Sequence, residues 1–222
     1  MSVQWIPLES NPEAFNDFIA RMGIKGAECA DVYGFDDELI DMIPKPHLAL
    51  ILCYPDYKEV KKLMNPVYEK LSEEGAKIPD DVRRFQMPVV PFALFHSLTQ
   101  NEKHLNFGDG PFKKWFDNAK NLSVEERSDS LANASSLAEA HSTCAAIGDT
   151  DDGPNVDHHF ISYVNLNGTL YEFDSSRNFP RACGPTTQET LIKDAGKHCM
   201  ELSKKLGDNI SFSALALVGK QE

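Results

Sequence analysis

The pattern of hydrophobic and polar residues changes repeatedly between a helical and a strand period along the chain. Apolar residues spaced three or four apart behind an Asn-Pro or Ser/Thr-x-x-Glu signal predict helices, and unbroken or alternating apolar runs predict strands. By these criteria we expect helices over residues 12–22 and 56–75, after Ser123, and from Thr186 to Gly207, and strands over 48–54, 159–166, 169–174 and 210–218. No βαβ unit or other repeat appears, so we predict one α+β domain spanning residues 1–222.

The clearest local structure is a β-hairpin at Asn167-Gly168. This dipeptide separates two alternating apolar segments, which is the strongest short hairpin signal in a sequence. A two-residue turn fixes the register, so residue 161 faces Asp174. Because side chains alternate, His159 shares a face with residue 161. We therefore predict that His159 and Asp174 are diagonal neighbours across the two strands.

A histidine beside a carboxylate is the arrangement of a general base and its orienting group. The carboxylate accepts from one ring nitrogen and fixes the tautomer, which leaves the other nitrogen basic. The alternative is a histidine and an aspartate at the fraying end of a hairpin, each bonded to water. The hairpin pattern alone favours this second interpretation.

Residues 135–157 are small and polar and lack apolar periodicity beyond Leu137. Gly148, Gly153 and Pro154 interrupt the segment. We therefore expect a long, mobile surface loop here, and loops of this length are uncommon unless they are functional or disordered.

Composition restricts the partners and the compartment. The formal net charge of −12 argues against binding to nucleic acid or to an anionic membrane surface. The start of the chain has no basic segment followed by an apolar run, so no secretory signal is expected. The five cysteines are odd in number and none is spaced as C-x-x-C, which indicates reduced thiols in the cytoplasm. No zinc site and no cofactor motif is visible.

Several segments, in order, resemble those of one family. They are Trp5–Glu13 (WIPLESNPE), Asp31–Asp36 (DVYGFD), His159–Ile161 (HFI), Leu170–Asp174 (LYEFD), Phe179-Pro180 and Phe212–Leu217. Their order and spacing resemble the ubiquitin carboxyl-terminal hydrolase family of small papain-like cysteine peptidases, nearly from end to end.

The resemblance implies a fold, an activity and several roles. The fold would be the papain-like α+β fold, with a mostly antiparallel central sheet, helices on both sides and a knotted backbone. The activity would be hydrolysis of small adducts from the C-terminal glycine of ubiquitin, by a monomer without cofactor. His159 would be the catalytic base and Asp174 its orienter. Pro7, Leu8, Glu9 and Phe212 match positions that touch ubiquitin, and residues 135–157 match the loop that crosses the active site.

The chain departs from the family at the nucleophile. The family reads Q-x-x-x-N-A-C-G-T before the helix that begins here at Phe92, whereas this chain reads Met87–Pro91 (MPVVP). Gln86 is a candidate oxyanion donor, although it is closer to the helix than the family's glutamine. An ungapped match places Val89 at the nucleophile position, and a valine side chain cannot attack a carbonyl.

Two explanations of the missing thiol remain open. Cys144 lies in the predicted loop and could approach the groove, but its flanking residues hold no group that favours a thiolate. Alternatively, the codons AAT GCC TGT GGT ACC followed by T encode Asn-Ala-Cys-Gly-Thr. Read one base later they give ATG CCT GTG GTA CCT, which encodes Met87–Pro91. A frame slip or misplaced exon boundary would then have removed the cysteine.

The sequence therefore supports two functions. The first is a deubiquitinating thiol peptidase whose nucleophile segment is lost or misread in this chain. The second is a catalytically dead ubiquitin-binding protein that keeps the surface and lacks the chemistry.

Overall fold

The computed structural model describes residues 5, 8–54, 57–76, 78, 82, 92–145, 159–207 and 212–220. Within them, six strands form an antiparallel sheet in the order β1-β6-β2-β3-β4-β5. The strands are β1 (Ala27–Asp31), β2 (His47–Tyr54), β3 (His159–Leu166), β4 (Thr169–Phe173), β5 (Arg181–Pro185) and β6 (Ser213–Gly219).

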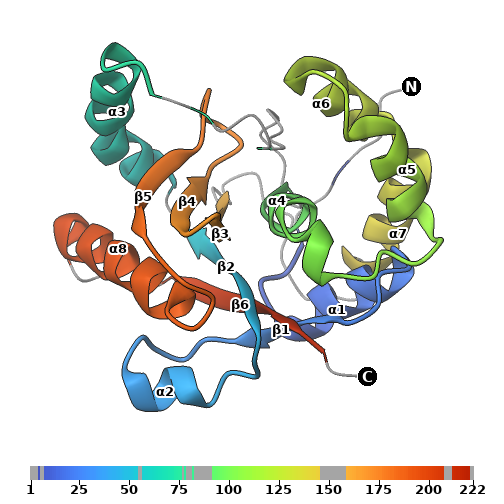
Figure 1. Cartoon of the computed structure of the whole chain (residues 1–222), viewed down its shortest axis with the longest axis horizontal. Helices are drawn as coiled ribbons and strands as arrows, with labels where there is room; N and C mark the ends of the chain where they lie inside the picture. Colours follow the sequence, from blue (N-terminus) through green and yellow to red (C-terminus); the bar gives the residue numbers. More distant parts are fainter. Residues whose placement is uncertain are drawn as a thin grey trace.

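Helices cover both faces of the sheet (Figure 1). One face carries α1 (Pro12–Arg21), α4 (Phe92–Gln100), α5 (Pro111–Ala119), α6 (Val124–Ala132) and α7 (Ser135–Ala145). The other carries α2 (Asp37–Asp41), α3 (Tyr57–Glu73) and α8 (Leu191–Leu206), and a short 3-10 turn, η1 (Glu102–His104), follows α4. This is the α+β architecture that the sequence predicts.

Strand β2 shows why two cores form. All eight of its residues are buried, and from Ala49 to Tyr54 they alternate between the two clusters of apolar side chains. Ala49, Ile51 and Cys53 belong to the cluster under α1 and α4, whereas Leu50 and Leu52 belong to the cluster under α8. A strand that is buried on both faces reads as a continuous apolar run, which is why β2 is easy to locate in the sequence.

Local capping signals fix several helix ends as predicted. Asn11 caps α1, because its Oδ1 accepts from Ala14 N at 2.8 Å. Ser123 and Glu126 form the reciprocal capping box of α6, with bonds of 3.2 and 3.0 Å. Helix α8 ends at Gly207, whose φ of 94° lies in the left-handed region that glycine adopts readily.

Two predictions in the second half of the chain are wrong. Helix α8 begins at Leu191 and not at a capping box from Thr186, because Thr187 and Thr190 bond each other's backbone N–H at 3.1 and 3.2 Å. The first half of the predicted loop is helix α7, because its buried residues recur at helical spacing: Leu137, Ala138, His141 and Cys144. Residues 146–157 lie outside the described residues.

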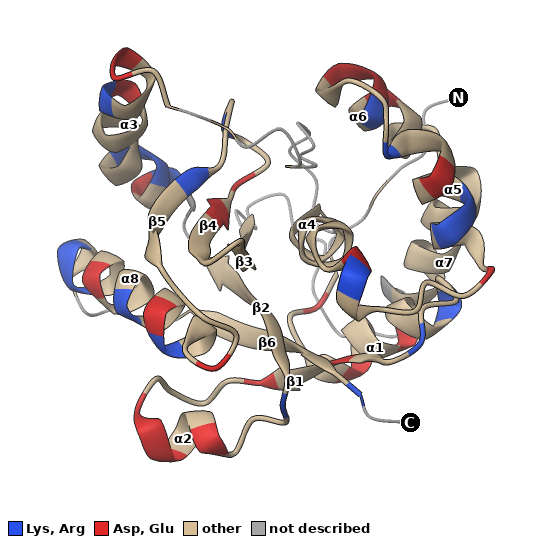
Figure 2. Cartoon of the chain, in the orientation of Figure 1, with Lys and Arg blue, Asp and Glu red and all other residues tan. Residues whose placement is uncertain are grey.

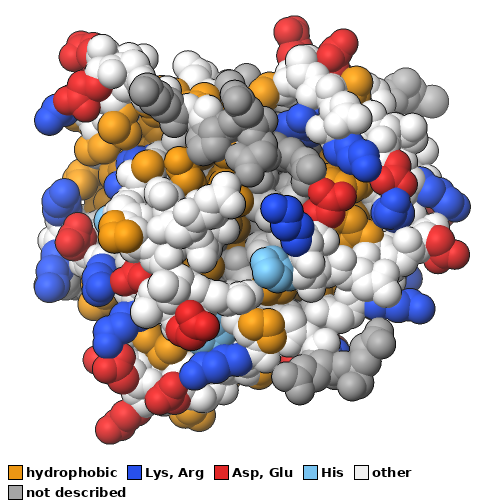
Figure 3. All heavy atoms as spheres, viewed as in Figure 1, with side chains coloured by type: hydrophobic (Ala, Val, Ile, Leu, Met, Phe, Trp, Pro, Cys, Tyr) orange, Lys and Arg blue, Asp and Glu red, His pale blue; other side chains and the backbone are white. Residues whose placement is uncertain are grey.

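Charged groups are distributed unevenly over the elements. Helix α2 is acidic, with Asp37 and Glu38 in its first turn, whereas α8 carries charges of both signs (Figure 2). Acidic side chains also gather over α2 at the lower left of the surface view (Figure 3). No helix among the described residues is long and apolar enough to cross a lipid bilayer.

Candidate active site

The β3–β4 hairpin brings His159 and Asp174 together. Asn167 and Gly168 both have positive φ angles, 52° and 84°, and Leu166 pairs with Thr169 as the two-residue turn predicts. His159 begins β3 and Asp174 follows the last residue of β4. His159 Nε2 donates to Asp174 Oδ1 at 2.8 Å, so the predicted diagonal contact is a direct hydrogen bond.

The burial of both side chains argues against the alternative interpretation, in which His159 and Asp174 lie at a fraying hairpin end and bond to water. The side chain of Asp174 is only 3% exposed and that of His159 14%. Asp174 Oδ1 also accepts from the backbone N–H of Ser176 at 2.9 Å. A hydrogen bond that is shielded from water holds the imidazole in one orientation and, with Nε2 donating, leaves Nδ1 as the basic nitrogen.

A second buried carboxylate, Glu172, supports the strand that carries Asp174. It accepts from the hydroxyls of Tyr68 at 2.9 Å and Tyr163 at 2.5 Å, and from Arg181 Nε and Nη2 at 3.1 and 2.6 Å. Burial alone would raise the pKa of Glu172, but the Arg181 guanidinium and the hydroxyl donors outweigh it and lower this pKa. The network ties β4 to α3, β3 and β5 two residues before Asp174.

The sequence gives a partial signal for this network. Glu172 and Asp174 are two residues apart, so strand alternation places them on one face. A charged residue within an apolar strand needs a partner when it is buried. The partners Tyr68 and Arg181 lie on other elements, and nothing in the local pattern indicates them.

Helix α4 runs beside this hairpin (Figure 1). Ser97 Oγ and Ser162 Oγ lie 2.7 Å apart, and the rings of His96 and Phe173 are 5.1 Å apart. The predicted nucleophile position, Val89, and the predicted oxyanion donor, Gln86, lie outside the described residues, immediately before this helix.

None of the five cysteines has the surroundings of an activated thiol. Cys29, Cys53, Cys144 and Cys199 are buried, and Cys183 is partly buried. Burial raises the pKa of Cys53 and of Cys183 to about 12, and raises those of Cys29 and Cys199 as well. Activated thiols have a lowered pKa and access to solvent, so these five groups are poor nucleophiles.

Cys144 lies in helix α7 and not in a loop, which corrects the prediction that it could approach the groove. Its Sγ donates to Asp17 Oδ2 at 3.2 Å and to Ala140 O at 3.2 Å. Burial first, and then the Asp17 carboxylate, raises the pKa of Cys144 to about 12. The helix holds this thiol within the core.

The predicted partner-binding residues differ in how far they are exposed. Pro7 lies outside the described residues, and Leu8 is 3% exposed within the core, so its side chain offers almost no surface to a partner in this conformation. Glu9 is half-buried. Phe212 is partly buried just before β6 and stacks on Phe35, with ring centroids 6.1 Å apart.

These segments meet at the end of the sheet that holds His159. Ser213 Oγ donates to Ser10 Oγ at 2.7 Å, which joins the segment of Glu9 to the start of β6. Cys53 pairs with Ser213 and the adjacent Tyr54 pairs with His159. The predicted contact surface and the histidine–aspartate pair are therefore neighbours at one end of β2.

A hollow of about 280 Å³ lies elsewhere, between residues 99–104 and the turn at residues 165–168. The turn is at the opposite end of the hairpin from His159, so this hollow does not belong to the candidate active site. Among the described residues, no group of three or more His, Cys, Asp or Glu side chains is arranged to hold a metal ion.

Comparisons with known proteins point to one family. The family model described as "Ubiquitin carboxyl-terminal hydrolase, family 1" matches residues 5–204. A Drosophila melanogaster ubiquitin carboxyl-terminal hydrolase is 34% identical, covering 98% of this chain and 99% of its own. Ubiquitin carboxyl-terminal hydrolase 3 of Arabidopsis thaliana is also 34% identical, covering 97% of this chain and 94% of its own.

A solved structure has the same fold. The Trichinella spiralis UCH37 catalytic domain, bound to ubiquitin vinyl methyl ester, superposes with a TM-score of 0.77 at 20% identity, covering 98% of this chain and 96% of that one. The antiparallel sheet flanked by helices is the predicted papain-like α+β fold. Since the family model and relatives above 30% identity span nearly all of it, the chain belongs to the ubiquitin carboxyl-terminal hydrolase family of cysteine peptidases.

Proposed function

We propose that the organism's protein is a deubiquitinating thiol peptidase that removes small adducts from the C-terminal glycine of ubiquitin. The 2.8 Å bond between His159 and Asp174 carries this proposal. His159 Nδ1 takes the proton of the attacking thiol, and the imidazolium then protonates the leaving group. The resulting thioester is hydrolysed by water that His159 activates. Asp174 stays ionised throughout and orients the ring.

The nucleophile belongs to the connection between α3 and α4. Helix α3 packs on one face of the sheet and α4 on the other. Residue 89 lies on this connection, just before Phe92 begins α4. A cysteine near a helix N-terminus and an imidazolium is favoured as thiolate. With Val89 there, the chain as written lacks the group that His159 would serve.

We infer that the missing cysteine reflects a shifted reading frame over residues 87–91. Two observations support this. The single-base shift reproduces all five residues, and the five cysteines that the chain does contain are buried or partly buried, with raised pKa values. Sequencing the mature transcript tests the inference. An in-frame ATG CCT GTG GTA CCT would contradict it.

The second candidate is a catalytically dead ubiquitin-binding protein. The observation that favours it is the valine at position 89, if it is genuine. The predicted ubiquitin contacts Glu9 and Phe212 are also present in the chain. Leu8 would then anchor these contacts from the core. Under both functions, ubiquitin is the partner, as in the ubiquitin-derivative complex of the Trichinella spiralis protein. The formal net charge of −12 suits the basic C-terminal segment of ubiquitin.

Capture by ubiquitin vinyl methyl ester separates the two functions. Under the first, the protein translated from the verified transcript becomes covalently attached to the probe, and His159→Ala prevents attachment. Under the second, the chain binds ubiquitin reversibly and is not captured, while Phe212→Ala weakens binding. In either case we propose that residues 1–222 form a single domain of the family's catalytic fold. We propose that it is a monomer that acts in the cytoplasm without a cofactor.

A further inference from the structure

Arg177 lies against the carboxylate of Asp174 from the side opposite His159. Its Nε is 3.5 Å from Asp174 Oδ2, whereas His159 bonds Oδ1. The side chain of Arg177 is 9% exposed, so this charge is nearly as well shielded from water as the carboxylate. Each oxygen of Asp174 therefore faces a different side chain.

Helix α3 holds the guanidinium of Arg177 in place. Nη1 donates to Asn65 Oδ1 at 2.6 Å and Nη2 donates to Lys61 O at 3.2 Å. The guanidinium carbon lies 4.7 Å from the centre of the Tyr68 ring, a cation–π distance. Residues 61, 65 and 68 are four and three apart, so one face of α3 supplies all three contacts.

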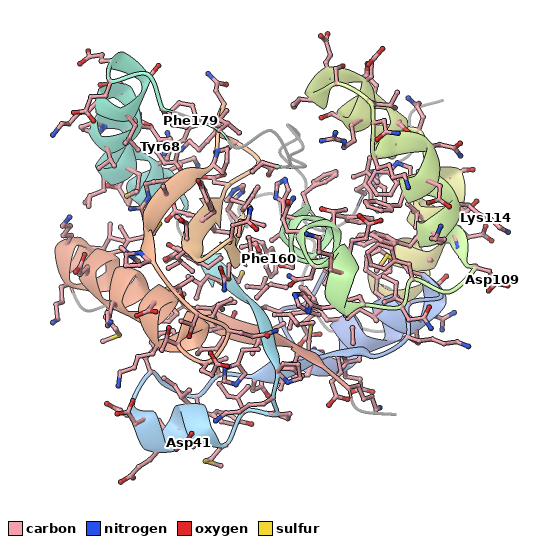
Figure 4. All side chains as sticks on the ribbon, in the orientation of Figure 1. Asp41, Tyr68, Asp109, Lys114, Phe160 and Phe179 are labelled. Carbon is pink, nitrogen blue, oxygen red and sulfur yellow. The ribbon has the colours of Figure 1, made fainter. Side chains whose placement is uncertain are left out.

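Tyr68 also connects this face of α3 to the chain beyond Asp174. Its hydroxyl donates to Glu172, and its ring packs against Phe179 at 5.5 Å. In the stick view, Tyr68 and Phe179 lie together between α3 and the segment leading to β5 (Figure 4). By contrast Phe160, the neighbour of His159, packs with Phe15 of α1 on the other face. The segment after Asp174 is therefore anchored to α3.

A carboxylate can turn about the bond that carries it, and only one orientation places Oδ1 against His159. A cation fixed opposite Oδ2 favours that orientation and stabilises the ionised form. A lysine would supply the charge but not the planar set of donors that reaches both Asn65 and Lys61.

We propose that Arg177, anchored by α3, is a positioning residue for the His159–Asp174 pair. The proposal rests on the function proposed above, because it assigns Arg177 a role in keeping the base oriented. It also makes α3 part of the active-site support. A purely structural role, tying α3 to the segment after β4, would leave the orientation of His159 unchanged when Arg177 is removed.

Nitrogen-15 NMR of the histidine rings tests this in the chain as it exists. The ring nitrogen shifts of His159 report which nitrogen carries the proton, and the Nε2-bound proton shifts downfield when it is hydrogen-bonded to a carboxylate. In Arg177→Ala we expect an upfield shift of that proton and the appearance of the second tautomer. Arg177→Lys should restore the signal in part.

Two further variants keep the test decisive. Asn65 is exposed, so we expect Asn65→Ala to fold. It should change the His159 signals in the same direction, even if Arg177→Ala fails to fold. The matched control is Arg21→Ala, which removes an exposed ion pair with Asp17 on α1 and should change nothing at His159. Unchanged His159 signals in Arg177→Ala, or in Asn65→Ala if Arg177→Ala does not fold, would overturn the proposal.

Activity separates this proposal from the function on which it rests. In a chain whose residues 87–91 are replaced by Asn-Ala-Cys-Gly-Thr and whose missing upstream residues are restored, Arg177→Ala should lower kcat about tenfold or more, with a smaller change in KM, as expected for a misoriented base. If the NMR signals respond but the replaced chain is inactive with Arg177 present, the proposed function fails and the positioning role stands.

Discussion

Glu172 and Arg181 form a two-point ion pair inside the protein, with Arg181 Nε and Nη2 at 3.1 and 2.6 Å from the two carboxylate oxygens. The side chains are 4% and 15% exposed. Strand β4 carries Glu172 and leads directly into Asp174, so this pair fixes the strand on which the candidate active site depends.

Glu172→Gln should therefore destabilise the fold strongly. The amide keeps the size of the carboxylate but leaves the Arg181 charge without its counter-ion in a shielded site, which costs about 3 kcal/mol. Urea unfolding at pH 7 measures the change in the free energy of unfolding. Asp117→Asn, which breaks an exposed pair with Lys113 on α5, is the matched control and should change this free energy far less. Equal effects of the two substitutions would contradict the role given to the buried pair.

Asn16 of α1 closes the open edge of the sheet. Its Nδ2 donates to Cys29 O at 3.0 Å and its Oδ1 accepts from Cys29 N at 2.6 Å, so its amide replaces a neighbouring strand at β1. Asn16→Ala should lower the free energy of unfolding by about 2 kcal/mol, because two partly buried backbone groups lose their partners.

The control for this prediction is Asn118→Ala, which removes a single exposed bond from Asn118 Nδ2 to Lys114 O within α5. It should have a much smaller effect in the same unfolding measurement. The exposed edge of β1 in Asn16→Ala should also promote self-association, which sedimentation velocity detects. A variant as stable and as monomeric as the parent would show that the edge does not need this amide.

The sequence predicts the structure correctly where a local signal is strong. The Asn167-Gly168 turn determined the hairpin register and hence the contact between His159 and Asp174, and the apolar run of β2 located the central strand. Helix α7 was mistaken for a loop because its small residues conceal the helical spacing of His141 and Cys144.

Contacts that depend on distant segments could not be predicted from the sequence. Arg177 and Asn65 are 112 residues apart, and nothing near either one indicates the other. Strands β1 and β5 were also missed. Strand β1 is short, lies at the edge of the sheet and alternates weakly, and β5 contains Gly184 and Pro185, which usually argue against a strand.

His141 should make the protein sensitive to mild acid. Its ring is fully buried between Trp5 and Phe18, at 5.1 and 5.3 Å, and neither ring nitrogen has a hydrogen-bond partner among the described residues. Burial lowers the pKa of His141 from 6.5 to about 4. The unfolded chain therefore binds a proton below pH 6.5 that the folded protein excludes, so stability falls as the pH drops from 6.5 towards 4.

At pH 5 this difference corresponds to about 2 kcal/mol of lost stability. His141→Phe, which cannot ionise, should show a correspondingly smaller loss between pH 7 and pH 5 in urea unfolding. His104→Phe, at an exposed position in η1, is the control and should keep the pH dependence of the parent. An unaltered pH dependence in His141→Phe would refute the assignment.

The central claim is that His159 and Asp174 form a working base and orienter that lack only their thiol. Steady-state hydrolysis of a ubiquitin C-terminal amide tests it most directly. The chain as written is compared with a restored chain, in which residues 87–91 read Asn-Ala-Cys-Gly-Thr and the missing upstream residues are added after Gln86. We expect no turnover by the chain as written and clear turnover by the restored chain. In the restored chain, His159→Ala should abolish turnover. A matched control that carries alanine in place of the restored cysteine should also be inactive. Two results would contradict this claim. One is turnover by the unmodified chain that survives Cys144→Ser. The other is a restored chain that folds and binds ubiquitin but remains inactive.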